Sequence, residues 1–499
     1  MNSPKKFNVF EHFLNSTIHP VEQSLRQDSK WHFRHAYHHE VRDPPPENQS
    51  YSCLCHEIKW ILRLSQLVGF NPLTIKCHSD TNASRDNILS PKLDLTSPTK
   101  CKLSRIKCSY PFINAFLAVF GLLIIISLVS KTLQPVVASM FSGTDAYAFK
   151  IHVNFRVTQS ILVLICGLIF NRHLSSGWES IQQIASFLNH KFPSSVSRTS
   201  KMLTLGSFLM GSINVWYTIW LGVRLCYVDG VDRNRTEGRI LGKLQDTCFD
   251  IGIGNYVMFV WVLSGSEFTH LTMASFLFVI ALVVKCLHAK LATLLEQILD
   301  ESITQGENDQ DGFAYKDLKY RGMTKELDFE MIRLVYEKLN ETVIHIRKFF
   351  GVPCLVICCD GILTCVFGFY WRIIYYENLP DEDGHSADIY NLILFSMHFL
   401  YSVMSLLLIL ISGHIMATTA LDVPKVIRKA KLSHLNSSAR FQVSLLLQVS
   451  AGFPTKFTVY SITNLEMPFL AAATTNVITY LLVLMQFRME QTSQGLAHH

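Results

Sequence analysis

Residues 467–487 read MPFLAAATTNVITYLLVLMQF, an apolar stretch close to the C-terminal end of the 499-residue sequence. A helix rises about 1.5 Å per residue, so about 20 apolar residues are enough to cross the hydrocarbon core of a bilayer. The small residues from Ala471 to Thr475 would let another helix approach closely. Thr479 and Gln486 add polar groups that a helix in contact with lipid alone does not need. The stretch therefore predicts a spanning helix that either packs against other helices or serves as a lone lipid anchor.

Similar apolar runs occur along most of the chain, in which 49% of residues are hydrophobic and 17% are charged. Six of them precede this one, at 111–130, 155–175, 202–224, 254–285, 349–374 and 387–417. The charged residues are largely confined to the segments between the runs. This pattern predicts an all-α polytopic membrane protein with seven transmembrane helices. The fourth and sixth runs exceed a straight span, so they should tilt or continue beyond the membrane.

The positions of Lys and Arg predict the orientation of the chain. Basic residues are concentrated in 1–110 and in the predicted helical loops 286–348 and 418–466, whereas 375–387 is acidic. Because basic loops stay in the cytoplasm, we expect an intracellular N-terminus and an extracellular C-terminal tail at 488–499. The basic residues of 225–250 disagree with this assignment, but the other loops outweigh them. The net charge of +6 is spread through loops, so it argues for topology and against a nucleic-acid partner.

The N-terminal segment 1–110 is polar, and we expect no signal peptide in it because it lacks a sufficiently long apolar core. Within it, 58–70 is amphipathic and is expected at the membrane surface. The His residues between His32 and His39 fit no closed zinc pattern, so we read them as part of a solvated tail.

The segment 225–250 has the features of an extracellular loop. Asn234 begins an Asn-Arg-Thr glycosylation acceptor, and Cys226 and Cys248 flank it. A disulfide between these two cysteines is plausible, but two positions do not establish a pairing. The remaining acceptors lie in segments assigned to the cytoplasm and should stay unmodified: Asn15, Asn48, Asn82, Asn340 and Asn436.

Ionisable residues inside predicted spans are candidates for function. Glu267 and His270 lie three residues apart on one helical face of the fourth run, Asp360 lies in the fifth run, and His398 lies in the sixth. These residues either pair with one another and stabilise the bundle, or they contribute to a functional site. For His270 we expect pairing.

Aromatic residues gather in the outer halves of the same spans. Such rings form an interfacial belt or line a pocket for a small ligand. On the second reading, the candidate ligand contacts are Trp216, Trp220, Trp261, Glu267, Tyr370 and His398.

The motif Thr-Tyr at 479–480, five apolar residues and Gln-Phe at 486–487 resembles the C-terminal signature of the arthropod gustatory receptors. These proteins are ligand-gated cation channels of the insect chemoreceptor superfamily. Residues 61–73 (ILRLSQLVGFNPL) resemble the N-terminal motif of that family, and 334–350 resemble the segment before its fifth span. The orientation expected from charge is also the one that this family shows.

The resemblance implies a homo- or hetero-tetramer in the plasma membrane, opened by a small-molecule tastant and permeable to cations without selectivity. Residues 111–487 would form the channel domain, in contact with membrane lipid, and its last helix would line the pore. We expect the pore and gate to use Thr479, Tyr480, Val483, Gln486 and Phe487. Sugar-sensing members tend to have an acidic residue after Thr-Tyr; Leu481 stands here, so bitter, fructose-like and carbon-dioxide ligands remain open.

Two alternatives remain: an odorant-receptor-like channel of the same superfamily, and a transporter. The sequence shows neither the internal repeat nor the paired broken helices that are typical of many transporters. It also contains no nucleotide-binding loop, zinc-hydrolase pattern or nucleophile elbow, so we expect no enzymatic activity and no cofactor.

Overall fold

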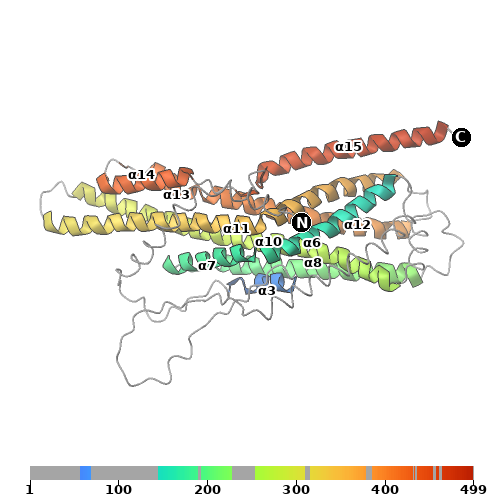
Figure 1. Cartoon of the computed structure of the whole chain (residues 1–499), viewed down its shortest axis with the longest axis horizontal. Coiled ribbons are helices and arrows are strands. Elements are labelled where there is room, and N and C mark those ends of the chain that lie inside the picture. Colours follow the sequence, from blue (N-terminus) through green and yellow to red (C-terminus); the bar gives the residue numbers. More distant parts are fainter. Residues whose placement is uncertain are drawn as a thin grey trace, which may run out of the picture. The chain divides into compact units, whose positions relative to one another are not determined.

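The structure is a computed structural model that describes residues 57–68, 144–188, 193–227, 253–308, 315–377, 385–430, 432, 435, 437–452, 457–459 and 463–497. These residues are almost entirely helical (Figure 1). The chain divides into two compact units. Among the described residues, unit 1 draws on Leu291–Lys338 and Pro424–Gly452, and unit 2 on Ser52–Lys290, Leu339–Val423 and Phe453–His499.

Among the described helices, three contribute to both units: α10 (Ile253–Asn308), α11 (Tyr315–Glu377) and α13 (Asp422–Lys429). Unit 1 also contains α14 (Ser437–Gly452). The other elements belong to unit 2: α3 (Lys59–Leu67), α6 (Thr144–Ile169), α7 (Asn171–Phe187), α8 (Ser194–Tyr227), α12 (His385–Thr419), β1 (Thr458–Val459), β2 (Thr463–Asn464) and α15 (Met467–Ala497).

Four of the described helical segments are long and apolar enough to cross a membrane: Glu267–Asp300, Asp328–Tyr370, Ser396–Lys429 and Met467–Phe487. A bent pair, Ile161–Ile169 with Asn171–Ala185, meets the same condition as one broken span. The predicted run 202–224 falls in α8, some of whose side chains are not described, and the run 111–130 lies outside the described residues. The prediction of an all-α protein with several apolar helices is confirmed.

The second predicted run, 155–175, is not one straight helix. It bends by 59° between α6 and α7, where Phe170 separates the two helices. Polar residues follow at Asn171 and Arg172, and α7 continues as an amphipathic helix instead of an apolar one. Its apolar stripe is buried and includes Leu174, Trp178, Ile181 and Ile184. The helix thus changes direction where its sequence changes from apolar to amphipathic.

The core of unit 2 is centred on α10. Most side chains over several consecutive turns of this helix are fully buried: Phe276, Leu277, Val279, Ile280, Ala281, Val283, Val284 and Leu287. Only a narrow face, with Phe278, Leu282 and Lys285, is partly or fully exposed. A helix that is apolar and buried on most of its circumference lies inside a bundle. The rings of Phe276 and Phe350 lie 5.8 Å apart and join α10 to α11.

The amphipathic helix α3 packs against α8. Its apolar side is buried at Ile61, Leu62 and Leu64, while Trp60 remains 50% exposed. The predicted position of this helix at the membrane surface stays a prediction.

A short hairpin precedes α15. In it Thr458 pairs with Asn464 and Val459 pairs with Thr463. Phe457, Val459 and Leu465 are fully buried, and the Leu465 amide donates to the Phe457 carbonyl at 3.0 Å. Only helices were predicted for the loop 418–466, so this hairpin is an addition to the predicted fold.

The hairpin contacts α12 at Gly413. A Cβ atom at this position would overlap the carbonyl oxygen of Leu465. A backbone atom cannot yield as the end of a flexible side chain can, so the close approach of the hairpin to α12 requires glycine.

Most of α15 lies outside the core of its own chain. Only 11% of an 18-residue apolar stretch of α15 is buried, against 56–78% of the corresponding stretches in the other three long apolar helices. Among the α15 residues whose burial is described, only Ala473 and Val477 are buried. In a membrane protein, the remaining surface of α15 must face lipid, water or other chains.

The contact at Gly413 predicts a position-specific loss of stability. We expect Gly413→Ala to lower the free energy of unfolding by about 1–3 kcal/mol, because the added methyl group must displace the hairpin backbone. The measurement is thermal unfolding of the purified protein in detergent. Gly206→Ala is the matched control, because a Cβ there meets nothing within 4 Å. Equal stability of the Gly413→Ala variant and the wild type would contradict the close approach.

Candidate functional site

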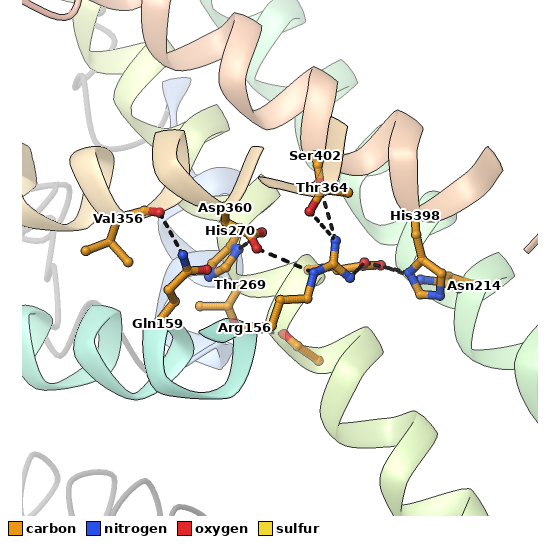
Figure 2. A network of polar contacts seen from close by, with 12 residues as sticks. Arg156, Gln159, Asn214, Thr269, His270, Val356, Asp360, Thr364, His398 and Ser402 are labelled. Atoms are coloured by element: carbon orange, nitrogen blue, oxygen red, sulfur yellow. Dashed lines mark hydrogen bonds and ion pairs between the residues drawn. The ribbon is translucent and has the colours of Figure 1, made fainter. Parts of the chain in front are cut away.

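Polar side chains from five helices meet in one buried cluster of unit 2, here named the polar network (Figure 2). Its members labelled in Figure 2 are Arg156 and Gln159 from α6, Asn214 from α8, His270 from α10, Asp360 and Thr364 from α11, and His398 and Ser402 from α12. Glu267 from α10 belongs to it through its contacts with Arg156, Asn214 and His398.

Arg156 contacts three neighbouring helices through one guanidinium group. Its Nη1 donates to Glu267, and its Nε lies 3.5 Å from Asp360 Oδ1. Its Nη2 donates to Thr364 Oγ1 at 3.1 Å and to Ser402 Oγ at 3.0 Å. The planar, multi-donor fork of arginine suits this role, whereas a lysine would offer a single point charge.

Glu267 accepts hydrogen bonds from three other helices. Besides Arg156, the Nδ2 of Asn214 donates to its Oε2 at 2.8 Å, and the Nδ1 of His398 lies 2.5 Å from its Oε1. Three donors satisfy a carboxylate that is only 3% exposed. A buried charge needs such pairing, because its desolvation is costly.

Asp360 and His270 form the other end of the network. His270 Nδ1 lies 3.6 Å from Asp360 Oδ2, which confirms the expected pairing of His270. Among the described residues, His270 Nε2 has no hydrogen-bond partner. Next to this pair, Gln159 Nε2 donates to the Val356 carbonyl at 3.1 Å and ties α6 to α11.

The network is buried almost completely, with one more accessible edge. The side chains of Arg156, Glu267, His270 and Asp360 are 2–4% exposed. That of His398 is 18% exposed. The His398 side chain is therefore the most accessible of the charged or titratable members.

Two of the six predicted ligand contacts, Glu267 and His398, meet directly in the network. Tyr370 is buried on α11, at 3% exposed, whereas Trp216 on α8 is 67% exposed and lies away from the core. Trp220 and Trp261 belong to α8 and α10, but their side chains are not described. Contact of any of these residues with a ligand stays a prediction.

The predicted gate residues all lie on α15. Tyr480, Val483 and Phe487 are 60%, 39% and 59% exposed, and Gln486 is also exposed. The Thr479 hydroxyl donates to the Thr475 carbonyl of its own helix at 3.0 Å.

Other predicted sites lie outside what the structure describes. Cys226 is in α8 with an undescribed side chain, and Cys248, Asn234 and the N-terminal histidines are outside the described residues. Within the described ranges, no group of three or more His, Cys, Asp or Glu residues is arranged to hold a metal ion.

Arg156, the residue that joins the network, was not among the predicted site residues. It lies in the predicted run 155–175, so the rule that selected Glu267 also applies to it. Thr364 and Ser402 carried no such signal, because serine and threonine are common in spanning helices.

Removal of Arg156 should be strongly destabilising. We expect Arg156→Leu to cost about 3–5 kcal/mol, because two buried carboxylates would lose their shared partner. Thermal unfolding of the purified protein and its cell-surface level measure the effect. Arg172→Leu is the control, since Arg172 is exposed on the neighbouring helix α7. Comparable stability of both variants would show that the ion pairs contribute little.

Comparison with known proteins identifies the family. The profile of the 7tm chemosensory receptor family matches residues 58–491, which is most of the chain. Among solved structures, the chain is similar to the insect olfactory receptor OR5 from Machilis hrabei, with 12% sequence identity and a TM-score of 0.52, covering 86% of this chain and 97% of that chain. The structure of OR5 from Machilis hrabei in complex with eugenol also matches, with 13% identity, the same coverage and a TM-score of 0.48.

Comparison with curated protein sequences gives no match. At 12% identity, the likeness to OR5 establishes the fold, and the apolar helices described above agree with a multi-pass membrane protein. The family profile covers the polar network and the exposed helix α15 up to residue 491. The chain therefore belongs to the 7tm chemosensory receptor family.

Proposed function

We propose that this chain is a gustatory-type receptor: a tetrameric, ligand-gated, non-selective cation channel of the plasma membrane that opens when a small-molecule tastant binds. Membership of the chemosensory receptor family supports the receptor class. The Thr-Tyr and Gln-Phe motif of α15 supports the gustatory type.

The observation that carries the channel proposal is the position of polar groups on the exposed helix α15. Asn476, Thr479 and Gln486 are all exposed. With about 100° per residue, these three residues share a face about 120° wide with Tyr480, Val483 and Phe487. Exposed amides are costly in lipid, so this face is expected to meet water or other subunits.

The buried side of α15 is displaced from this polar face. Ala473 and Val477, which are buried against the same chain, lie about 80–120° from the middle of the polar face. One side of the helix can thus contact its own bundle while another lines a shared pore. Four copies around an axis would place four such faces together.

The ligand is proposed to act on the helices that build the polar network. Glu267 and His398 offer hydrogen-bonding groups there, and Trp216, Trp220, Trp261 and Tyr370 are the proposed aromatic contacts. A small molecule that changes the packing of α8, α10, α11 and α12 can shift the balance between closed and open states only if it binds the two states with different affinity.

The proposed orientation has the N-terminus and the loops 286–348 and 418–466 in the cytoplasm. We expect Asn234 alone among the acceptor sites to carry a glycan, so Asn234→Gln should abolish the mass shift caused by glycosidase treatment. Asn340→Gln is the control and should leave the shift unchanged. A glycan on Asn340 or Asn15 would reverse the orientation.

The channel proposal is tested by single-channel recording on the purified receptor in planar bilayers. Phe487→Ser should produce a cation current without ligand, because a polar ring lets water persist at a hydrophobic constriction. Gln486→Ala should alter conductance or ion preference while the resting current stays low. Leu482→Ser is the matched control, since Leu482 is 59% exposed and lies about 140° from Phe487 around the helix.

Ligand-dependent flux without unitary currents would favour a transporter over a channel. If Phe487→Ser and Gln486→Ala both lost surface expression and neither passed current, the two residues would be packing positions instead of a gate.

A further inference from the structure

The β1–β2 hairpin lies at the base of α15 and contacts two helices of the polar network. On one side, Arg347 Nη1 of α11 donates to Thr458 Oγ1 at 2.9 Å. On the other, Gly413 of α12 lies against the Leu465 carbonyl. The first residue of α15, Met467, follows two residues later. The hairpin therefore connects α11, α12 and α15.

The hairpin is held firmly at these contacts. Phe457, Val459 and Leu465 are fully buried, although the hairpin is only two residue pairs long. Val459 Cγ1 would lie 3.8 Å from a Cβ atom at Gly351, so it also packs closely on α11. An element with so few hydrogen bonds of its own owes its position to the helices that surround it. A displacement of those helices must therefore displace the hairpin.

Each of the two helices also carries members of the polar network. On α12, Gly413 lies about 16 Å along the axis from Ser402, and on α11, Arg347 lies about 20 Å from Asp360. Between Arg347 and Asp360, α11 contains Pro353, which lacks an amide hydrogen and so weakens the helix at that turn. Between Ser402 and Gly413, α12 contains no proline. The α12 segment is therefore the stiffer of the two connections.

The other end of this connection is the proposed gate helix. Because α15 is exposed along most of its length, its own chain can direct its tilt mainly through two contacts: the attachment at the hairpin and the packing of α15 against α12. Movement that reaches the hairpin would change the position of the whole helix.

We propose that the hairpin segment, residues 457–459 and 463–465, transmits ligand-induced movement of α11 and α12 to α15, with Arg347, Thr458 and Gly413 as its positioning residues. The proposal rests on the proposed channel function. It assigns these residues to coupling, and neither to ligand contact nor to the pore.

The test compares two replacements of Thr458: valine keeps the shape of the threonine side chain but has no hydroxyl, and serine keeps the hydroxyl but has no methyl group. Thr458→Val removes the hydroxyl that accepts from Arg347, and Thr458→Ser keeps it. At saturating ligand, we expect Thr458→Val to lower the open probability at least threefold while single-channel conductance stays at the wild-type value. Thr458→Ser should open like the wild type. A merely structural role would change the amount of protein at the surface and leave the open probability of each channel unchanged.

Four further variants make the test specific. Arg347→Met should reproduce the effect of Thr458→Val, and the double variant should be no worse than either, because both remove one interaction. In the Phe487→Ser background, where the gate is expected to leak, Thr458→Val should have no further effect. Arg347→Lys keeps a hydrogen-bond donor, so it should retain more of the open probability than Arg347→Met. It replaces Arg347→Met as the test variant if the latter does not reach the cell surface.

The outcomes separate this inference from the channel proposal. Normal open probability in Thr458→Val and Arg347→Met, or fully additive effects of the two, would overturn the coupling role while wild-type currents stand. Absence of ligand-gated current in the wild type would instead reject the channel. A changed conductance in Thr458→Val would place Thr458 in the ion pathway and also overturn the assignment.

Discussion

The guanidinium group of Arg156 is the contact on which the arrangement of unit 2 depends. It joins two carboxylates and two hydroxyls that come from α10, α11 and α12. Both carboxylates are buried, so neither could keep its charge at low cost without this partner. Apolar packing around α10 allows helices to slide or rotate by small steps. The directional bonds of one arginine do not, and they therefore define the relative register of four helices.

A bundle built this way combines two kinds of contact. Close apolar packing joins α10 to α11 around Phe276 and Phe350. The polar network adds directional hydrogen bonds and ion pairs between side chains of five helices. Its more accessible edge lies at His398. In this member of the chemosensory receptor family, apolar packing and the polar network therefore stabilise the same bundle in different ways.

The predictable parts of this structure were those set by local sequence. Apolar run lengths predicted the helices, and the spacing of Glu267 and His270 predicted a shared face. The bend at Phe170 was missed because the apolar run continues to Phe170 and gives no warning before Asn171. The hairpin at 457–465 was missed because its strands are two residues long and owe their shape to Arg347 and Gly413, which lie far away in the sequence. Arg156 could have been predicted as a candidate site residue, because it is an ionisable residue in an apolar run. Its partners on three other helices could not have been predicted, since pairing across a bundle depends on tertiary packing.

The polar network also restricts how this receptor can diverge. Replacing Arg156, Glu267 or Asp360 alone changes the buried charge by one unit, so a viable change at one of them calls for a compensating change on a different helix. No such restriction applies to the exposed apolar side of α8, where one apolar residue can replace another. This side includes Met202, Leu205, Leu209 and Ile213. Mutational drift should therefore be fast on the outer face of α8, whereas positions 156, 267 and 360 should change rarely and in linked pairs.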